Sequence, residues 1–284
     1  MNEIIVHIIG TAQDGGYPQV GCEEKCCTPV LKDYSLTRFP SCIALINPSN
    51  KKYWLFDVTP DIKKQVQMLS QYDCNLAGVF ITHAHIGHYM GLINFGLEVM
   101  NLDELPIHVM PRMKTFLENN SIMRQMIDNK NIKLIELSDN VPLYIDDAII
   151  TPFDVPHRNE LSETVGFQIK GKKKSIVYLP DIDSWNNWKN NLLDLIHSND
   201  VLFIDGTFFS EDELKSRDIS KVPHPLITDT MNILSDLDLD LKKKIHFIHF
   251  NHTNKVIQDG SDAANSVINN GFLLSKEQQS IKIS

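Results

Sequence analysis

The sequence lacks the features of a membrane-spanning protein and of a nucleic-acid-binding one. Its 27 Lys and Arg residues are outnumbered by 36 Asp and Glu, and the formal net charge is −9. Binding to phosphate backbones needs clustered cations, so we expect no nucleic-acid partner. No apolar run approaches the roughly 20 residues that cross a bilayer, and we expect no membrane partner. Residues 1–9 alternate as a strand does, without a basic segment before a long apolar one, which predicts no signal peptide and a cytoplasmic protein.

Cysteine is scarce, and its five residues do not form the pattern of a disulfide framework in a chain of 284 residues. Cys22, Cys26 and Cys27 are packed into one short segment, which favours metal binding. Thiolates with this spacing can share a tetrahedral zinc ion when a fourth ligand comes from elsewhere. Because the adjacent Cys26 and Cys27 do not easily reach one ion together, we favour Cys22 and Cys27 as ligands and leave Cys26 open as a third.

The composition and the periodicity indicate one α/β domain spanning residues 1–284. Hydrophobic residues make up 42% of the chain, which is enough to bury a full core. Residues 10–39 show no helical or strand periodicity, and a loop of this length in a compact domain is usually functional or pinned. Short apolar runs predict strands at residues 4–9, 41–46, 53–56, 107–110, 132–137, 148–155, 175–179, 201–204, 244–250 and around 281. Helices are predicted from Pro60 to about Leu69, from Pro111 to about Asn129 and from Asp262 to Ile268.

The stretch Gly78–Asn94, GVFITHAHIGHYMGLIN, carries three histidines directly after an apolar run that is typical of a buried strand. His83 and His85 are two residues apart, so on an extended chain their side chains point the same way. His88 lies one helical turn beyond His85, where the chain can turn into a helix. The three imidazoles are therefore predicted to converge, and imidazole suits zinc, iron and similar metals.

This stretch resembles the HxHxDH signature of the metallo-β-lactamase superfamily, with Gly87 where the signature has its aspartate. The resemblance implies that His83 and His85 bind a first metal, and that His88 binds a second metal that has lost its carboxylate. We therefore expect a metal at the first site to bind more tightly than any metal at the second. The resemblance also implies a four-layer αββα sandwich with the site along one edge, which the predicted order of strands and helices fits.

Further candidate ligands follow predicted strands. The resemblance matches His157 to the third ligand of the first metal, Asp181 to the carboxylate that bridges both metals, and His249 to the last ligand of the second. It matches Asp57 to an acidic residue that supports the ligand loop, although an ordinary aspartate at a strand end is an equal alternative. Asp181 has the alternative of capping a helix. His246 is an odd number of residues from His249, so on a regular strand it faces away, and we read it as a non-ligand.

Two more histidines are candidates for the sites. His224, in the proline-bounded segment KVPHPLI, could protonate a leaving-group oxygen, because its ordinary pKa of about 6.5 suits that task. Its alternative is a loop histidine that faces solvent. The chain more distantly resembles the phosphonate-pathway cyclic phosphodiesterases, in which a histidine after the last catalytic ligand completes a cysteine zinc site. The resemblance thus implies His252 as the fourth ligand beside Cys22, Cys26 and Cys27, and a substrate-contacting role is the alternative.

Four phrases outside the ligand set resemble the PQQ-biosynthesis protein B branch of the superfamily over nearly the whole chain: GTAQDGGYPQVGC, VPHRNELSETVGF, YLPDID and HFNHTN. The first function that the resemblance leaves open is a hydrolase that attacks a phosphodiester or related ester with metal-bound water, in which Asp181 and His224 are catalytic. The second is an iron-dependent oxygenase that hydroxylates a peptide or small molecule in cofactor biosynthesis. The third is a binding protein that has kept the fold and lost the chemistry. Six ligand positions survive and one is lost, which favours an enzyme.

These readings predict the cofactors and partners. We expect zinc at the cysteine site, and zinc, manganese or iron at the histidine site, as one ion or two. The expected partner is a small-molecule or peptide substrate. The oligomeric state is open, a homodimer included.

Overall fold

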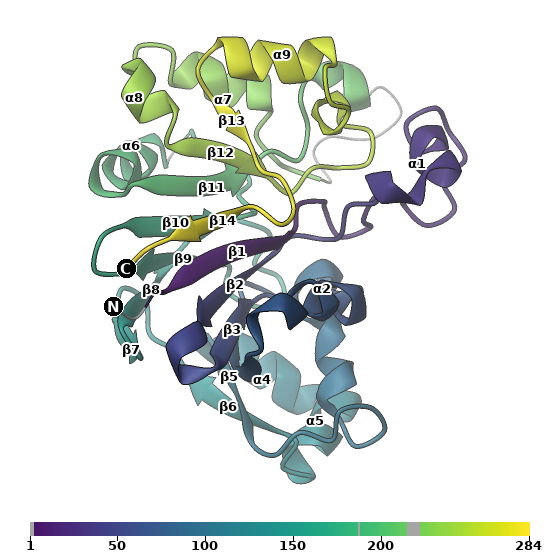
Figure 1. The fold of residues 1–284 in the computed structure, drawn as a ribbon, viewed down its shortest axis with the longest axis vertical. Coiled ribbons are helices and arrows are strands. Elements are labelled where there is room, and N and C mark those ends of the chain that lie inside the picture. The colour runs from purple at the N-terminus through teal and green to yellow at the C-terminus, as the bar shows by residue number, and fades with distance from the viewer. Residues whose placement is uncertain (1–2, 187, 215–221) are drawn as a thin grey trace.

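Two seven-stranded sheets stack against each other, and helices cover the outer face of each (Figure 1). The computed structural model describes residues 3–186, 188–214 and 222–284. The first sheet has the spatial order β14 (Ser280–Lys282), β1 (Ile5–Gly10), β2 (Cys42–Asn47), β3 (Lys52–Phe56), β4 (Asn75–Phe80), β5 (Leu105–Val109) and β6 (Ile132–Glu136). The second has the order β13 (Leu273–Leu274), β12 (Ile245–Ile248), β11 (Val201–Asp205), β10 (Ser175–Leu179), β9 (Val165–Lys170), β8 (Ala148–Asp154) and β7 (Leu143–Ile145). Both sheets mix parallel and antiparallel pairs.

Helices form the two outer layers, and the predicted α/β sandwich of four layers is confirmed (Figure 1). On the first sheet lie α2 (Ile62–Met68), α3 (Ile86–Tyr89), α4 (Pro111–Asn119) and α5 (Ser121–Asp128). On the second lie α6 (Lys189–Ser198), α7 (Ile227–Ile233), α8 (Leu239–Lys242) and α9 (Asp262–Asn269), while α1 (Thr28–Lys32) belongs to the loop after β1. Among the helices of the described residues, none has the length and apolarity needed to cross a bilayer.

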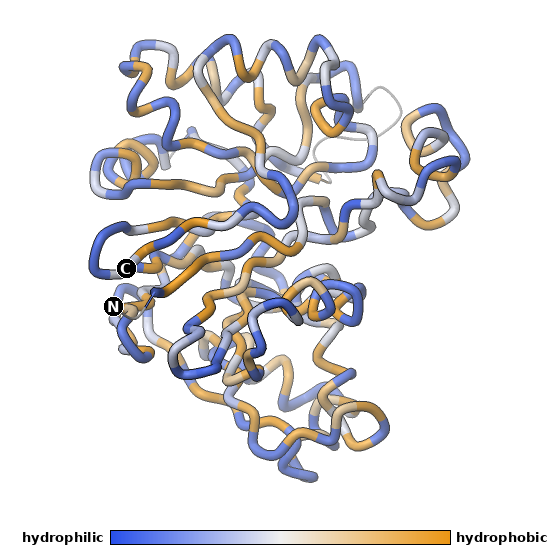
Figure 2. The backbone as a smooth tube through the Cα atoms, in the orientation of Figure 1, coloured by the Kyte–Doolittle hydropathy of each residue, from blue (hydrophilic) through white to orange (hydrophobic). Residues whose placement is uncertain are grey.

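Strands at the centre of the sandwich are apolar on both faces. In β10, Ile176 and Tyr178 contact the first sheet, while Val177 and Leu179 contact the helices on the other side. Because successive side chains of a strand point to opposite faces, burial of both faces produces an unbroken apolar run in the sequence. Figure 2 shows the apolar stretches of the chain concentrated in these strands, with mixed hydropathy along the outer helices. This is why short apolar runs predicted most of the strands.

An aromatic cluster joins the two sheets. The rings of Phe56 and Phe80, on neighbouring strands of the first sheet, are stacked at 4.8 Å between centroids. Phe167 of β9 meets Phe56 edge to face at 5.3 Å and Phe80 at 5.6 Å. Aromatic pairs of this geometry add about 0.5–1.5 kcal/mol each beyond the burial of their area. The cluster fixes one sheet against the other, so that the loops at the strand ends of both sheets meet at one edge.

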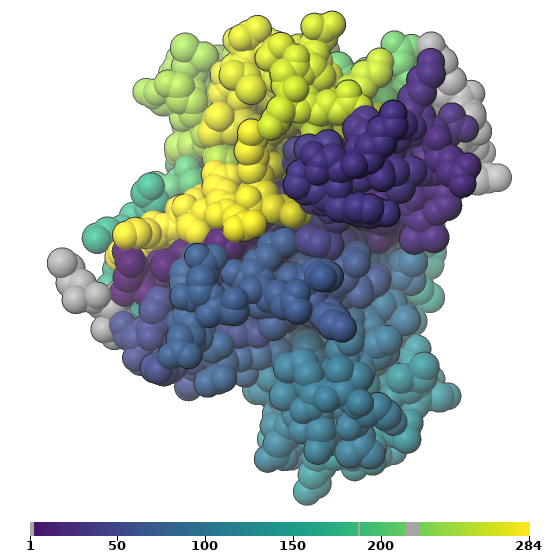
Figure 3. Space-filling view, turned by 45° about the vertical axis from the view of Figure 1, so that its right-hand side comes forward, coloured from purple at the N-terminus to yellow at the C-terminus, as the bar shows by residue number. Residues whose placement is uncertain are grey.

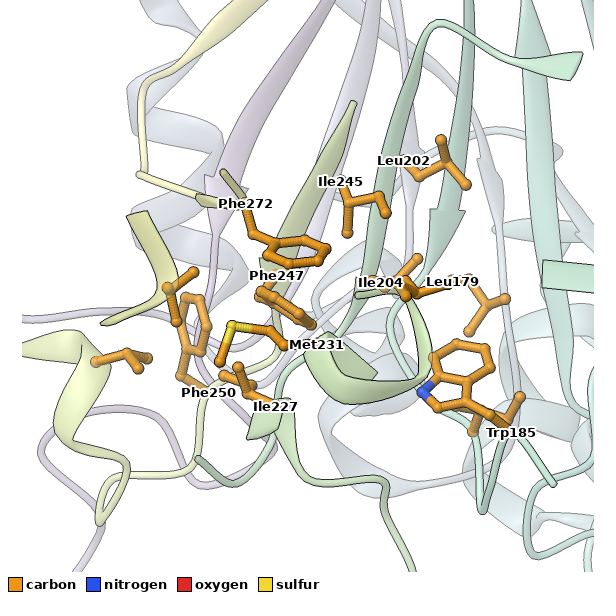
Figure 4. Packing of buried hydrophobic residues seen from close by; sticks show 14 of the residues in the cluster. Leu179, Trp185, Leu202, Ile204, Ile227, Met231, Ile245, Phe247, Phe250 and Phe272 are labelled. Atoms are coloured by element: carbon orange, nitrogen blue, oxygen red, sulfur yellow. The ribbon is translucent and has the colours of Figure 1, made fainter. Parts of the chain in front are cut away.

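The outer face of the second sheet packs against its helices through a separate apolar cluster (Figure 4). Ile227 and Met231 of α7 lie over Phe247, and Trp185 lies at the end of the cluster nearest β10 (Figure 4). The indole Nε1 of Trp185 donates a hydrogen bond of 2.8 Å to Thr230 Oγ1. This bond satisfies the one polar atom of a fully buried indole, and it ties the loop after β10 to α7.

Several predicted boundaries are wrong by a few residues. The helix predicted from Pro60 begins at Ile62, because Thr59 Oγ1 accepts from the backbone N–H of Asp61 in a turn that precedes the helix. The helix predicted across residues 111–129 is two helices, since the side chain of Asn120 caps α5. Strands β7, β9 and β13 were not predicted from the sequence.

The loop after β1 lies against the C-terminal part of the chain. Figure 3 shows the N-terminal segment, in purple, next to the C-terminal segment, in yellow. Ala12 forms parallel bridges with both Pro40 and Phe250, and the Arg38 guanidinium donates to the carbonyl oxygen of Ile257 at 3.0 Å. A segment without periodicity is therefore pinned at several points to the strand end that carries His249.

Candidate metal centre

Three histidine nitrogens converge where β4 ends. The strand stops at Phe80, and the chain reaches α3 only at Ile86, so His83 and His85 lie in the connecting loop. His83 Nε2 lies 2.9 Å from His85 Nδ1, and His157 Nε2 lies 3.3 Å from the same atom. Three bare imidazole lone pairs at these distances would repel, so a cation or a shared proton is needed between them. The predicted first set is therefore brought together with a geometry that fits a metal ion.

Asp181 lies between two sets of histidines. The first set is His83, His85 and His157, and the second set is His88 and His249. Asp181 follows β10 and is 3% exposed. Its Oδ1 faces His157 Nε2 at 3.7 Å, while its Oδ2 faces His88 Nε2 at 3.2 Å and His249 Nε2 at 3.4 Å. The two oxygens of one carboxylate thus point to different histidine sets, which is the arrangement predicted for a bridging residue. Its alternative as a helix cap is wrong, because α6 begins only at Lys189.

The second set contains a carboxylate that the sequence analysis did not identify. Asp14, in the loop after β1, places Oδ1 3.3 Å from His88 Nε2, and its ligand atom lies within 4.8 Å of those of His88 and His249. The expectation that this set lacks a carboxylate because of Gly87 is wrong. Asp14 was missed because its segment has no periodicity and lies far from His88 in the sequence. The repeated glycines of GTAQDGG, which allow a tight approach of the backbone, were the available signal.

Most rings are held by a contact on the side away from the centre. Thr82 Oγ1 lies 2.9 Å from His83 Nδ1, and Thr207 Oγ1 lies 2.9 Å from His249 Nδ1. His157 Nδ1 lies 2.9 Å from a carboxylate oxygen of Asp183. Such contacts leave Nε2 aimed at the centre and fix the orientation of the ring.

Asp57 supports the histidine loop, as the resemblance implied. It accepts from the backbone N–H of Thr82 at 2.8 Å, and it lies 2.7 Å from His88 Nδ1. The hydroxyl of Tyr178, on the second sheet, donates to the same carboxylate at 3.2 Å. Asp57 is fully buried, so the carboxylate connects the histidine loop, α3 and the second sheet in one hydrogen-bonded group.

The pKa shifts of the histidines differ between the first and the second set. Burial lowers the pKa of His83 well below its ordinary value and that of His85 to about 4, so both rings are neutral and able to bind a cation. Burial alone would also lower the pKa of His88, but the charges of Asp57 and Asp181 raise it well above the ordinary value. Burial raises the pKa of Asp181, and the neighbouring histidines, His249 first, outweigh this and lower it well below the usual range. The centre therefore presents charged carboxylate oxygens to whatever cation the rings hold.

His224 lies beside the centre, as predicted, and does not face solvent. Its Nδ1 lies 2.7 Å from Asp205 Oδ2, and its ring centroid lies 5.3 Å from that of His157. Burial would lower the pKa of His224, but the charge and the hydrogen bond of Asp205 raise it above the ordinary value. α7 begins at Ile227, three residues later, while Lys221, the first residue of the KVPHPLI segment, lies outside the described residues.

The cysteine segment and His252 form a second cluster. Cys26 Sγ lies 3.6 Å from both Cys22 Sγ and His252 Nδ1, and Cys27 Sγ lies 3.5 Å from His252 Nδ1. The cluster includes Cys22 and Cys27, which were favoured, and also Cys26, which was left open, since both adjacent thiols lie close to the imidazole. They do so because residue 27 has a helical backbone conformation just before α1, which turns its side chain toward that of Cys26. Burial raises the pKa of Cys27 to about 12, a cost that a bound cation would offset.

The remaining histidine assignment agrees with the structure. His246 points away from both clusters and packs edge to face on Phe203 at 5.4 Å, between the sheets and not at their edge. Solvent reaches the histidine centre near His85, which is partly buried, and Ile86 beside it is 61% exposed. A groove of about 740 Å³ lies next to the loop that carries His157, with Pro156, Asn159 and other residues in its wall.

Comparison with known proteins finds relatives that match over most of the chain. Coenzyme PQQ synthesis protein B from Methylorubrum extorquens is 24% identical over 293 residues, which cover 91% of this chain and 93% of the relative. The crystal structure of zinc-bound PqqB from Methylobacterium extorquens matches with a TM-score of 0.82 at 22% identity, covering 98% of this chain and 99% of that one. A diphosphatase of the PhnP family matches with a TM-score of 0.71 at 18% identity, covering 99% and 97%.

The structural likenesses show the fold, and a family model decides the membership. The model of the beta-lactamase superfamily domain matches residues 46–250, which is most of the chain and includes every histidine of the centre. The protein is thus a PqqB-like chain with the metallo-β-lactamase fold, and it belongs to the metallo-β-lactamase superfamily.

Proposed function

We propose that the protein is a metal-dependent hydrolase that cleaves a phosphodiester or related ester of a small molecule with metal-activated water. The observation that carries the proposal is the position of Asp181, whose Oδ1 faces His157 and whose Oδ2 faces His88 and His249. A carboxylate placed in this way could contribute a ligand to each of two cations, as two-metal hydrolases require.

The donor set suits borderline divalent cations. His83, His85 and His157 would hold a first ion with one oxygen of Asp181, and His88 and His249 would take part in a second. Imidazole with carboxylate suits zinc, manganese and iron. When bound, such ions supply a hydroxide at neutral pH and polarise the oxygen of the scissile group.

The chain itself supplies the groups that orient the substrate and move a proton. His224 is held by Asp205 through Nδ1, and one ring nitrogen of His224 lies within 4.8 Å of ligand atoms of His157 and Asp181. The carboxylate favours the protonated ring, so His224 can donate a proton to the oxygen that leaves. The groove beside His157 offers room for the part of the substrate that does not react.

The cysteine cluster is proposed as a structural zinc site. Cys22, Cys26, Cys27 and His252 provide four ligand atoms within 4.8 Å of one another. A closed set of three thiolates and one imidazole is typical of structural zinc and leaves no position for substrate.

The test is an assay of the purified protein with its metal content measured by mass spectrometry. We expect turnover of an aryl phosphodiester or a cyclic phosphodiester that depends on zinc or manganese. An Asp181→Asn variant should lose turnover by at least about 100-fold, because both cations lose a charged ligand. His197, exposed on α6, gives the matched control, and His197→Gln should keep full turnover. Turnover unchanged in Asp181→Asn, or absent with every ester and metal, contradicts the proposal.

The second candidate is an iron-dependent oxygenase acting on a peptide or small molecule. It is supported by the similarity to coenzyme PQQ synthesis protein B over 91% of this chain. The metal separates the two candidates. Iron retained through purification, with oxygen consumption in the presence of a peptide and no ester cleavage, favours the oxygenase, while zinc or manganese with ester cleavage favours the hydrolase.

A further inference from the structure

Gly87 and Asp14 occupy adjoining space at the second histidine set. A Cβ built on Gly87 would overlap Asp14 Oδ1 and would lie 2.7 Å from Asp14 Cα. Real Cβ atoms do not come so close to other heavy atoms, so a side chain at position 87 cannot coexist with Asp14 in its present position. The glycine is therefore required by the aspartate, and the space that the superfamily signature gives to a carboxylate at position 87 contains one from another part of the chain.

The carboxylate of Asp14 is directed at the second set. Its Oδ1 is buried and makes no hydrogen bond of good geometry to the described residues. His88 Nε2 lies 3.3 Å from Asp14 Oδ1, and the aspartate side chain as a whole is only 25% exposed. Asp181 Oδ2 and His249 Nε2 are in the same condition, buried and without such a bond among the described residues. Three polar atoms from three segments thus meet around one point with His88, and a cation at that point would satisfy all of them.

The backbone holds Asp14 there. The N–H of Gln13 donates to the carbonyl of Phe250 at 2.8 Å, and the N–H of Phe250 donates to the carbonyl of Thr11 at 2.8 Å. Residues 11–13 thereby pair with the residue that follows His249. The N–H of Gly16 closes the turn on the carbonyl of Gln13 at 2.8 Å, with Gly16 at a φ of 67° that suits glycine. Asp14 is thus presented by a turn that is anchored to another member of the same set.

We propose that Asp14 is the carboxylate ligand of the second metal and replaces the aspartate that the HxHxDH signature would place at position 87. The second site then consists of Asp14, His88, His249 and the shared Asp181. This inference rests on the metal centre of the proposed function, but it does not depend on which reaction the centre performs. It also reverses the expected weakness of the second site, because the charged donor is present and only its place in the sequence has changed.

The decisive measurement is the metal stoichiometry of an Asp14→Asn variant, which keeps the shape of the side chain and removes its charge. After dialysis we expect about three equivalents of metal in the wild type, two at the centre and one at the cysteine cluster, and about two in the variant. Titration with Co²⁺, followed by its visible absorption, should show the affinity of one centre site falling by more than tenfold. Even the loss of a residue that only hydrogen-bonds to a metal ligand typically lowers metal affinity about 10–100-fold. Glu23→Gln, which removes an exposed carboxylate from the same loop, should leave both readouts unchanged.

The outcomes separate this inference from the proposed function. Wild type without metal at the histidine centre would overturn both. If the wild type binds two ions at the centre and Asp14→Asn binds the same two with unchanged affinity, Asp14 is not a ligand. The proposed metal centre itself would not be affected by that result. Metal readouts as expected without any ester cleavage would support Asp14 and refute the hydrolase.

Moving the aspartate from position 14 to position 87 tests whether either position can supply the same metal-binding carboxylate. Gly87→Asp alone should lower the melting temperature or displace one metal equivalent, because its side chain collides with Asp14. In the double variant Asp14→Gly/Gly87→Asp, the second equivalent should return, with its Co²⁺ absorption. A double variant that binds no more metal than Asp14→Gly alone, or a Gly87→Asp protein that is unchanged in stability and metal content, would contradict the exchange of the two positions.

Discussion

Two residues at the centre adopt backbone conformations that an L-residue rarely takes. Asp57 has a φ of 68° and His249 a φ of 67°. Such a residue costs of the order of 1–3 kcal/mol, and it persists where the surrounding structure holds it in place. Asp57 is held by Thr82, His88 and Tyr178, and the ring of His249 by Thr207. The strain lies at the ends of β3 and β12, where Asp57 contacts His88 Nδ1 and His249 faces the centre, so it serves the site.

The first prediction at this scale concerns His224. We expect His224→Gln to reduce turnover about 10²–10⁴-fold, the range for loss of a general acid, with the metal content unchanged. The loss should shrink for an aryl ester whose leaving group needs no proton. Full turnover would remove the catalytic role. A lost metal equivalent would instead make His224 a ligand, a reading that its closeness to His157 and Asp181 also allows.

A second prediction follows from two buried histidines outside the centre. Burial lowers the pKa of His108, stacked on Phe80, and of His246 to about 4. The unfolded chain binds a proton on each near pH 6.5 and the folded chain does not until about pH 4, so folding stability should fall as the pH falls through this window. At 1.4 kcal/mol per pKa unit, each ring should lower the free energy of unfolding by roughly 3 kcal/mol near pH 4 relative to neutral pH.

Denaturant unfolding of the chelator-treated protein between pH 7 and 4 measures this effect without a contribution from metal loss. His108→Phe, in β5 of the first sheet, and His246→Phe, in β12 of the second sheet, should each weaken the pH dependence of the free energy of unfolding. Equal slopes for wild type and both variants would contradict the assignment of the acid sensitivity to these rings.

At the scale of elements, the loop of residues 11–41 is built into the site although it contains little regular structure. It provides Asp14 to the histidine centre and three cysteines to the other cluster, and Ala12 bridges it to Phe250. His252 follows His249 by three residues and belongs to the cysteine cluster, so one strand end serves both. A zinc ion at the cysteine cluster would tie the loop to β12 close to where the loop presents Asp14.

The element-scale prediction is that His252→Ala lowers the zinc content by about one equivalent and lowers the melting temperature, because metal binding contributes directly to folding free energy. Metal analysis and calorimetry measure the two effects. Cys74→Ser, which alters a thiol outside the cluster, is the control and should keep the zinc. Activity lost with zinc content and melting temperature both intact would place His252 in the substrate pocket.

The limits of prediction from the sequence are visible in particular elements. β10 could be predicted because both of its faces are buried, so its sequence is apolar throughout. β9 was missed because Gly166 and Gln168 interrupt its apolar run, and β7 because it has three residues and its Tyr144 is 72% exposed.

The site divides in the same way. Candidate ligands such as His157 and His249 were identified through the resemblance, and the apolar runs that precede them place both at strand ends. Asp14 was missed, because its place depends on the pairing of residue 12 with residue 250, and the glycines after it indicate a close approach of the backbone without identifying the distant segment that it meets.

At the scale of the whole molecule, the histidine centre joins the two sheets. His83, His85 and His88 follow β4 of the first sheet, while His157, Asp181 and His249 follow β8, β10 and β12 of the second. Between the sheets the contacts are mainly apolar, and Tyr178 to Asp57 is a buried hydrogen bond that crosses from one to the other near the centre. Metal ions at the edge would therefore act as cross-links between the two halves of the sandwich.

The last prediction is that removing the metal weakens both sheets together. An ion that binds only the folded chain stabilises it by about 4 kcal/mol at a free concentration a thousand times its dissociation constant, and two ions add their effects. Chelation should therefore lower the melting temperature. It should also raise the rate of hydrogen exchange at the backbone N–H groups of Thr82 and Ile182. These groups donate to the carboxylates of Asp57 and Asp205, which lie behind the centre on opposite sheets.

Performing the experiment in the His252→Ala background separates this effect from that of the cysteine cluster. Asp181→Asn in that background should lose most of the chelator response, since its carboxylate would contribute a ligand to both proposed sites. A chelator effect confined to one sheet, or one equally large in Asp181→Asn, would show that the centre does not couple the halves through the shared carboxylate.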